Sequence, residues 1–303
     1  MKITLIHNPT AGVEAYSGKK LVSLLKKADH NVTYVSVKDA DYKNAYKQST
    51  DLLLAAGGDG TVRRVAQQAI TRGIPMSILP TGTNNYVAEA LGITAEPEDI
   101  ISSLDTARKT KLDAGVVKGP WGEVKFITAC GFGLVPNCLR TVERRRKQGR
   151  NIEYLSLLRE KAAKFKAQYC EVFLDGNDVS GEYFLLEIMN IPTIAPGLIF
   201  APNAKMADGY MEFVMALEAD RPAFVKTLEN DEDPHAFTLP SRQFKHMHME
   251  IPDSLTHIDD RLRPKNDDTL PTHAYIDIHV LSEGVEFLLA GNNAPKKTVR
   301  SKK

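Results

Sequence analysis

The sequence is poor in cysteine and tryptophan, with three and one, respectively, among 303 residues. Cys130, Cys138 and Cys170 are odd in number and match no metal-binding spacing, so we expect reduced, buried thiols and no disulfide framework. Stretches such as Leu52–Ala56 and Val285–Ala290 are too short to span a bilayer. Because the amino terminus also lacks the long apolar run of a signal peptide, we expect a cytoplasmic protein whose only membrane contact would be peripheral, at the inner membrane face.

An excess of one charge is absent as well. Lys and Arg total 39 against 38 Asp and Glu, which gives a net charge of +1. A balanced chain has no overall attraction to nucleic acid, and no basic and aromatic alternation is present, so we expect no nucleic-acid partner. Hydrophobic residues make up 43% and charged residues 25%, which is the composition of a folded protein, and the length allows two domains.

The first third of the chain repeats strand, tight turn and helix. Strand patterns at Lys2–His7, Asp51–Ala56 and Pro75–Leu79 are each followed by a loop of small residues and then by a helical pattern. Parallel strands place their carboxyl ends at one edge of a sheet, where ligands bind in open α/β sheets. The pattern therefore predicts an α/β domain over residues 1–112 with three converging loops.

The pattern changes after residue 112. Strand-like segments then dominate as far as residue 289, and one helical region, Val135–Gln168, interrupts them. We expect a mostly antiparallel β domain over residues 113–289, either a sandwich or a barrel, and a basic tail over residues 290–303.

The strongest chemical signal is Gly57-Gly58-Asp59-Gly60-Thr61, between a buried strand and a helix. Glycines let the backbone approach a ligand, and the amides at the start of the helix favour phosphate. A carboxylate would repel bare phosphate, so Asp59 is expected to hold Mg²⁺ or to accept a proton from a hydroxyl. The alternative is a tight turn in which Asp59 or Thr61 caps the helix. Neither G-x-G-x-x-G nor the G-K-[S/T] of a P-loop is present, which argues against an ordinary dinucleotide fold and a Walker-type ATPase.

This turn belongs to an ordered set of motifs. The set comprises Asn8-Pro9-x-x-Gly12, G-G-D-G-T, Pro80-x-Gly82-Thr83-x-Asn85, Asp113-Ala-Gly, Gly131-Phe132-Gly133, Asn190, Ala201–Lys205 and Asp208-Gly209. Over nearly the whole chain the sequence thus resembles the diacylglycerol kinase catalytic-domain superfamily, which includes bacterial lipid kinases and sphingosine kinases. One motif alone would also suit NAD kinases or phosphofructokinases, whereas the ordered set is more specific.

The resemblance implies a fold and an activity. The fold would be a three-layer α/β domain of the NAD kinase and diacylglycerol kinase type, followed by a β-sandwich domain, with ATP in the cleft between them. The activity would be Mg²⁺-dependent transfer of the γ-phosphate to a hydroxyl of diacylglycerol or a related membrane lipid.

The resemblance also assigns roles to single residues. The nucleotide would be bound by Asn8, Pro9, Gly12, Gly57, Gly58, Gly60, Thr61, Gly82, Thr83 and Asn85. Asp59 and Asp113 would belong to a Mg²⁺ and water network at the reacting phosphate. A structural metal would be held by the Lys205 carbonyl, the Asp208 carboxylate and the Tyr210 carbonyl, although an ordinary hairpin turn is the alternative for Asp208-Gly209.

Two positions depart from the family pattern. An acidic residue commonly follows the Asn of G-T-x-N, and this chain has Tyr86 there. The family also carries a late Asp-Gly-Glu whose Glu is the base for the lipid hydroxyl. The best match here is Asp259-Asp260-Arg261, and because an arginine cannot accept that proton, Asp259 and Asp260 become the candidates. Two alternatives stay open: a nucleotide- or lipid-binding homologue that has lost catalysis, and a kinase of a soluble hydroxyl compound such as NAD.

The stretch Arg140–Lys166 is strongly basic, with ten Lys or Arg against three Glu. A basic helical face would contact anionic lipid, as a peripheral membrane enzyme requires. The alternative is an ordinary solvated helix with a packed apolar stripe. The sequence leaves the oligomeric state, including a homodimer, open.

Overall fold

The computed structural model describes residues 1–12, 16–150, 153–195, 198–229, 239–251, 255–264 and 274–291. The chain divides into two compact units, one made of Met1–Lys111 with Val285–Lys303 and the other of Leu112–Gly284. The first unit is therefore discontinuous in sequence. Two strands, β5 (Arg108–Gly119) and β19 (Ala274–Leu289), contribute residues to both units. Among the described residues, no helix is both long enough and apolar enough to cross a membrane.

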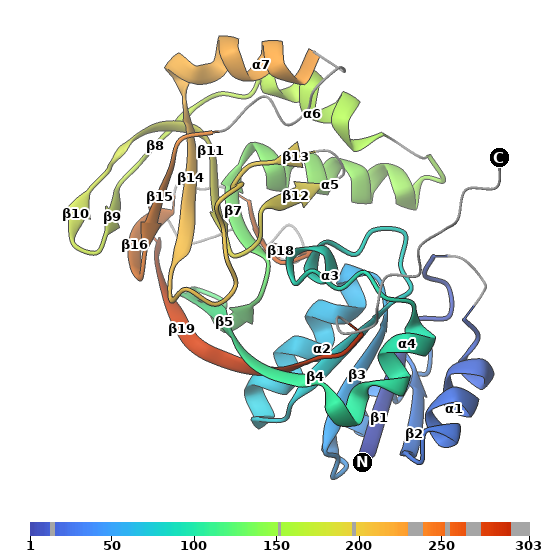
Figure 1. Ribbon diagram of the computed structural model, residues 1–303. Helices are drawn as coiled ribbons and strands as arrows, with labels where there is room; N and C mark the ends of the chain where they lie inside the picture. The colour runs from blue at the N-terminus through green and yellow to red at the C-terminus, as the bar shows by residue number, and fades with distance from the viewer. Residues whose placement is uncertain are drawn as a thin grey trace, which may run out of the picture. The chain divides into compact units, whose positions relative to one another are not determined.

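The first unit is a three-layer α/β domain. Its elements are β1 (Lys2–His7), α1 (Gly18–Lys27), β2 (Asn31–Ser36), the 3-10 helix η1 (Tyr42–Lys47), β3 (Leu52–Gly57), α2 (Asp59–Arg72), β4 (Met76–Pro80), α3 (Tyr86–Ala90), α4 (Pro97–Ser102) and η2 (Leu104–Thr106). The parallel sheet has the order β2-β1-β3-β4, and the end of β19 extends it beside β4. α1 and α4 pack together on one face of the sheet, while α2 covers the other (Figure 1).

Burial explains this arrangement. β3 is apolar throughout and all its residues are buried, as expected of a central strand covered on both faces. α2 packs one apolar stripe on the sheet and ends at Gly73, which takes the left-handed conformation common after helices. The Ser77 hydroxyl donates to the Leu288 carbonyl at 2.8 Å, and Phe287 pairs with Met76 in parallel. These contacts fasten the end of β19 to β4.

The second unit is an antiparallel β-sandwich, as expected. Besides its parts of β5 and β19, its strands are β6 (Gly122–Phe126), β7 (Ala129–Gly133), β8 (Gln168–Cys170), β9 (Val172–Leu174), β10 (Asn177–Asp178), β11 (Gly181–Met189), β12 (Thr193–Ala195), β13 (Leu198–Ile199), β14 (Met211–Leu217), β15 (Ser241–Phe244), β16 (His246–Ile251), β17 (Thr256–Ile258) and β18 (Arg261–Arg263). One sheet has the order β15-β14-β11-β7-β17-β18, with β8 also on β11. The other joins β10, β9, β16 and β19, with β5 and β6 on the β19 side.

Two apolar cores lie on either side of the first of these sheets. The core between the sheets contains Phe126, Phe132, Phe213, Met249 and Ile276. The other core lies under the helices α5 (Leu134–Lys147), α6 (Tyr154–Ala162) and α7 (Arg221–Glu229), which cover the outer face of that sheet (Figure 1). The three cysteines are distributed between these cores as buried, free thiols, which confirms the expectation from sequence.

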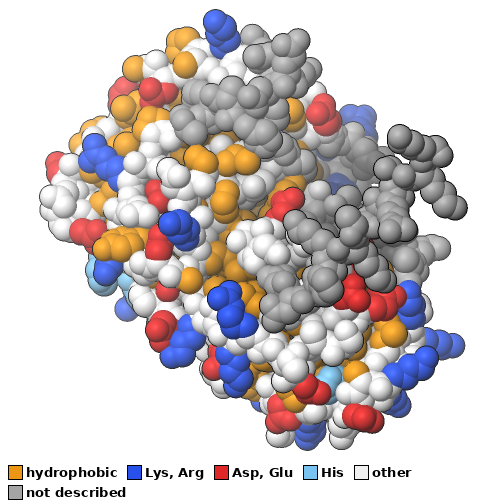
Figure 2. Space-filling model, viewed as in Figure 1, with side chains coloured by type: hydrophobic (Ala, Val, Ile, Leu, Met, Phe, Trp, Pro, Cys, Tyr) orange, Lys and Arg blue, Asp and Glu red, His pale blue; other side chains and the backbone are white. Residues whose placement is uncertain are grey.

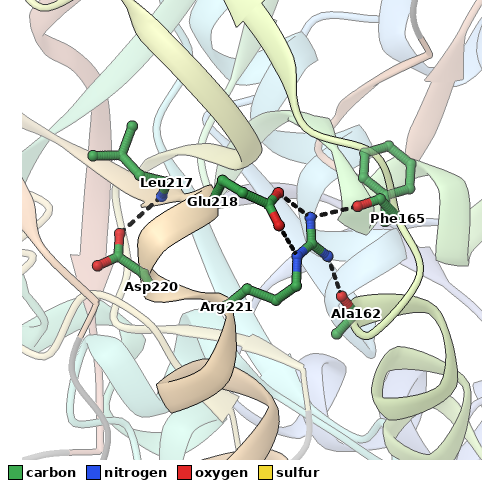
Figure 3. A network of polar contacts seen from close by, with 6 residues as sticks. All are labelled: Ala162, Phe165, Leu217, Glu218, Asp220 and Arg221. Carbon is green, nitrogen blue, oxygen red and sulfur yellow. Dashed lines mark hydrogen bonds and ion pairs between the residues drawn. The ribbon is translucent and has the colours of Figure 1, made fainter.

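Arg221 joins two of the covering helices (Figure 3). Its guanidinium donates to the carbonyls of Ala162 and Phe165, at the end of α6, and pairs with Glu218 in the 3-10 helix η3 (Glu218–Asp220). The same group lies 4.5 Å from the centre of the Phe184 ring. One side chain, at the start of α7, thus satisfies the last carbonyl of α6 and a carbonyl of the segment that follows it.

Two boundaries differ from those expected. The helical region Val135–Gln168 is two helices rather than one, because the chain leaves α5 at Gln148 and Gly149 takes a φ of 72°. The second domain was expected to extend to residue 289, but Val285–Leu289 belong to the first unit because β19 continues beside β4. The expected tail at 290–303 lies outside the described residues from 292 onward.

Candidate functional site

The loops after β1, β3 and β4 meet at the carboxyl edge of the first unit's sheet. The Asn8 amide donates to the Ala56 carbonyl at 2.9 Å, which joins the first loop to the end of β3. A Cβ placed on Gly82 would lie 2.2 Å from the Gly58 Cα, and one placed on Gly12 would lie 2.0 Å from the Thr81 carbonyl oxygen. These loops therefore touch backbone to backbone, at distances that no side chain would permit.

Asp59 stands at the centre of this contact. It opens α2, directly after the N-cap residue Gly58, so it belongs to the first helical turn. Its Oδ1 accepts a hydrogen bond of 3.1 Å from the Val87 amide in the first turn of α3. The carboxylate therefore joins the starts of two helices, as a cap does, while it remains beside the glycine loops.

Tyr86 lies next to Asp59, where the family commonly has an acidic residue. Burial raises the pKa of Tyr86 to about 12, and the carboxylates of Asp59 and Glu89 act in the same direction. Its hydroxyl is buried and has no hydrogen-bond partner among the residues that the structure describes. At neutral pH this position therefore supplies a neutral phenol, a donor, in place of a second negative charge.

The other nucleotide-binding candidates of the first unit lie in the same three loops. Asn85 braces its own loop, since its Nδ2 donates to the Gly82 carbonyl at 3.0 Å and its Oδ1 accepts from the Gly82 amide at 3.1 Å. The Asn8 Oδ1 accepts from the Thr10 amide and hydroxyl. Pro9 and Thr83 are exposed, and Gly57, Gly60 and Thr61 flank Asp59. The structure thus brings together all ten nucleotide-binding candidates and Asp59.

Asp113 belongs to the second unit and anchors a loop there. It is 3% exposed. Its Oδ2 accepts from the Gly209 amide at 2.7 Å and its Oδ1 from the Glu283 amide at 3.0 Å, while its own amide donates to the Met206 carbonyl. Asp113 therefore holds the loop that contains Lys205, Asp208 and Tyr210, a contact between residues almost a hundred positions apart.

The three metal-ligand candidates lie in this anchored loop. The Asp208 Oδ1 accepts a hydrogen bond from the Tyr210 backbone amide at 3.1 Å, and its Oδ2 is 3.4 Å from the Gln243 side-chain Nε2. Lys205 and Tyr210 are exposed. In the part of the chain that is described, no three His, Cys, Asp or Glu side chains form a metal cluster. A cation here would be bound by one carboxylate, backbone carbonyls and water, which are donors that suit Mg²⁺ or Ca²⁺.

Replacing Asp113 by asparagine is expected to lower the free energy of unfolding by about 2 kcal/mol, because one of the two amide donors would then face an NH₂ group. Urea denaturation followed by circular dichroism measures this difference. Glu123→Gln removes an exposed charge from the neighbouring strand β6 and is the matched control, with an expected change close to zero. Equal midpoints for the two variants would contradict an anchoring role for Asp113.

The two acidic residues of the late motif, Asp259 and Asp260, lie in different environments. Asp259 is 4% exposed, and its Oδ1 accepts from the Ile127 amide, the Thr128 amide and the Thr128 hydroxyl at 2.7–3.2 Å. Asp260 and Arg261 are exposed at the turn between β17 and β18. The carboxylate of Asp259 is thus buried with its Oδ1 held by the Ile127–Thr128 segment, and that of Asp260 is accessible.

Asn190 is a residue whose role the sequence did not show. It donates through Nδ2 to the carbonyls of both Asp113 and Ile127, at 3.0 Å each, and its amide donates to the Thr128 carbonyl. Because Asp259 binds the same Ile127–Thr128 segment, one polar network joins Asp113 to Asp259. Glu187 and His257, a buried pair at 2.8 Å, were also missed, since isolated polar residues in apolar strands carry no spacing signal.

The basic stretch Arg140–Lys166 lies on α5 and α6 and on the segments beside them. Leu157 and Leu158 pack into the core under the helices, as an ordinary amphipathic helix does. Arg144, Arg146 and Lys147 at the end of α5 are exposed. Unlike these three neighbouring basic residues, the basic and acidic side chains on the face shown in Figure 2 are interspersed.

Comparisons with known proteins agree with this architecture. The model of the diacylglycerol kinase catalytic domain matches residues 2–117, and that of the YegS C-terminal NAD kinase beta sandwich-like domain matches residues 129–241. A diacylglycerol kinase of Bacillus subtilis is 27% identical over 237 residues, which cover 73% of this chain and 76% of that protein. One of Mycobacterium tuberculosis is 24% identical over 266 residues, covering 83% and 85%.

Solved structures agree in fold. A putative diacylglycerol kinase from Bacillus anthracis superimposes with a TM-score of 0.70 at 20% identity, covering 97% of this chain and 98% of that one. Yeast NADH kinase complexed with NADH gives a TM-score of 0.52 at 11% identity, covering 95% and 82%. The two family models together match most of the chain, in the order in which its motifs occur. The chain belongs to the diacylglycerol kinase catalytic-domain superfamily, a family of kinases.

Proposed function

We propose that the protein is an ATP- and Mg²⁺-dependent lipid kinase that transfers the γ-phosphate to a hydroxyl of diacylglycerol or a related membrane lipid. The observation that carries the proposal is the backbone contact between Gly58 and Gly82 beside Asp59. It leaves the amides of the first turn of α2 next to a carboxylate, the combination that phosphate and its cation need. The relatives named diacylglycerol kinase support the acceptor class.

The first unit would bind the nucleotide. The amides of Gly58–Gly60 would donate to phosphate oxygens at the start of α2, with the loops around Asn8, Gly12 and Thr83 beside them. Asp59 would hold Mg²⁺, which neutralises charge on the phosphoryl group during transfer. Tyr86 would contribute a neutral donor beside it, because its pKa is too high for it to ionise at neutral pH.

The second unit would supply the base and the structural cation. We assign the base to Asp260, which is exposed, because Asp259 is only 4% exposed with its Oδ1 already accepting three hydrogen bonds, and the Arg261 guanidinium cannot accept a proton. Asp113 would act as a positioning residue, since it orders the loop of Lys205, Asp208 and Tyr210. That loop would hold the structural cation through the Asp208 carboxylate and the Lys205 and Tyr210 carbonyls.

The experiment is transfer of radiolabelled γ-phosphate from ATP with Mg²⁺. Acceptors are mixed vesicles with diacylglycerol, the same vesicles without it, and NAD in solution. Transfer to diacylglycerol is expected for the protein as it stands and should fall at least about 100-fold in Asp260→Asn. Transfer to NAD alone would contradict the lipid as acceptor, and equal rates for Asp260→Asn and the unchanged protein would contradict Asp260 as base.

Tyr86 and Arg261 favour a second candidate, a homologue that binds nucleotide or lipid without turnover. ATP binding by calorimetry with no transfer to any acceptor would support this candidate. In that case Arg261→Glu, which creates the acidic residue of the family motif, is expected to produce transfer if only the base is missing.

We also propose that the exposed basic residues at the end of α5 contact anionic lipid. Each Lys or Arg side chain close to an anionic bilayer contributes about 1 kcal/mol of attraction. Reversing Arg144, Arg146 and Lys147 to glutamate is expected to abolish co-sedimentation with vesicles that contain phosphatidylserine, at low salt. Binding that is equal for neutral and anionic vesicles would contradict this surface.

A further inference from the structure

Three residues form a row across the sheet of the second unit. Gly131 on β7 pairs with Glu187 on β11 on one side and with His257 on β17 on the other. A Cβ on Gly131 would lie 2.1 Å from the Glu187 Oε1, so only glycine leaves room there. The two outer side chains therefore meet above the central strand, with Glu187 Oε2 2.8 Å from His257 Nε2.

The partners of His257 determine how many protons the pair holds. Its Nδ1 lies 2.9 Å from the Asp259 carbonyl oxygen, and because a carbonyl only accepts, Nδ1 carries a hydrogen and donates it. One further proton then lies between Nε2 and the carboxyl oxygen of Glu187. The pair is either imidazolium with carboxylate or imidazole with carboxylic acid, and it is neutral overall in both forms. Loss of that proton would leave a negative charge in the core.

Stability alone does not account for this pair. Glu187 and His257 are 0% and 2% exposed, and buried ion pairs are often no better for stability than apolar residues of the same volume. The Glu187 Oε1 has no hydrogen-bond partner among the described residues, which adds a cost of desolvation. The chain also keeps a glycine in the middle of a strand to accommodate the pair, although glycine weakens strands.

His257 of this pair contacts the turn between β17 and β18, which carries the accessible carboxylate of Asp260. His257 holds the carbonyl of Asp259, while the Ile127–Thr128 segment holds its carboxylate. Asp259 itself has a φ of 50°, a conformation unusual for a residue with a side chain, so both contacts fix a strained turn. The next residue in this turn is Asp260.

We propose that Glu187 and His257 share one buried proton, and that this pair is a positioning device that fixes the Asp259–Asp260 turn for its work on the acceptor hydroxyl. The positioning role rests on the proposed function, whereas the shared proton does not. Neither residue touches substrate in this scheme. Glu187 sets the orientation of the His257 ring, and the ring sets the carbonyl of Asp259.

The surroundings give the pair a pH dependence of known sign. Burial raises the pKa of the Glu187 carboxyl, and His257 opposes this shift. The other titratable groups near the pair are Asp259, Cys130 on β7, Tyr154 on α6 and, two positions along β14 from the residue that pairs with Glu187, Glu212; burial raises the pKa values of Cys130 and Tyr154 well above the usual. Cys130 and Tyr154 therefore add no charge at neutral pH. Since the folded pKa is raised, the folded chain binds more protons, and the stability from the pair is lost as pH rises through that pKa.

The test compares thermal unfolding of the full chain from about pH 5 to about pH 9, on either side of the ordinary histidine pKa. In the unchanged protein the midpoint should fall with rising pH above the ordinary histidine pKa of about 6.5, with a slope approaching one proton, because there the unfolded chain has lost the proton that the folded pair keeps. Glu187→Gln should flatten that slope, because glutamine cannot take up the proton. His257→Asn, which can still donate to the Asp259 carbonyl, is the second variant if the first does not fold. Glu212→Gln alters another buried glutamate of the sheet and should keep the original slope.

Phosphate transfer gives the second readout. Glu187→Gln should lower kcat about 10-fold with an unchanged KM for ATP, and the loss should be smaller than that of Asp260→Asn. Equal pH slopes for the unchanged protein and both variants would overturn the shared proton. A changed slope with an unchanged kcat would overturn the positioning role. No transfer by the unchanged protein would instead defeat the proposed function, and the pH slopes would still decide on the proton.

Discussion

Gly82→Ala is expected to abolish ATP binding and to lower the free energy of unfolding by about 3 kcal/mol, the upper range for overpacking a rigid contact. The added methyl group would lie 2.2 Å from the Gly58 Cα and 2.6 Å from the Gly58 nitrogen, both backbone atoms that no rotamer change can move away. The loop after β4 must then separate from the start of α2. Because the amides proposed to bind phosphate lie at that start, the same movement should remove the nucleotide site.

Calorimetric titration with ATP and urea denaturation measure the two effects. Gly73→Ala is the control, since Gly73 has a φ of 62° but a Cβ there would meet nothing within 4 Å. It should cost about 1 kcal/mol of conformational strain and leave ATP binding unchanged. If Gly82→Ala behaved like Gly73→Ala, the close approach of the loops would not be essential.

Asp59→Asn is expected to lower kcat for phosphate transfer by at least about 100-fold without a loss of stability. Asparagine keeps an oxygen that can accept from the Val87 amide, so the cap on α3 is preserved, whereas the negative charge is lost. Asp59→Ala removes both and should in addition lower the free energy of unfolding by about 1 kcal/mol. Kinetics at saturating ATP and Mg²⁺ separate these effects. Turnover that survives in Asp59→Asn would show that Asp59 acts only as a helix cap.

The sequence was most informative where function depends on local backbone. Gly57–Thr61 follows a strand so apolar that burial on both faces was the natural prediction, and the structure buries all of it. Three such strand–turn–helix repeats suffice to predict that their loops share one edge of a sheet. The prediction succeeds for these loops because the strand before each loop and the helix after it are both encoded in the same short stretch of sequence.

Contacts between distant parts of the chain could not be predicted in this way. Asp113 reaches the Gly209 and Glu283 amides, 96 and 170 positions away, and nothing in its own segment indicates either partner. The same holds for Glu187 and His257, which meet only because Gly131 lies between them in a third strand. In the helical region, the continuous basic pattern predicted one helix, and the break at Gly149 was missed.

The discontinuity of the first unit has a consequence for biosynthesis. A ribosome that has released residues 1–111 has made every described element of that unit except the end of β19, so the edge of β4 stays uncovered while the whole second unit is being synthesised. Only when Val285–Ala290 emerge can Phe287 pair with Met76 and Leu288 accept the bond from Ser77. The unit that begins first is thus completed last. A nascent chain arrested before residue 285 would carry a folded β-sandwich and an open, aggregation-prone sheet edge.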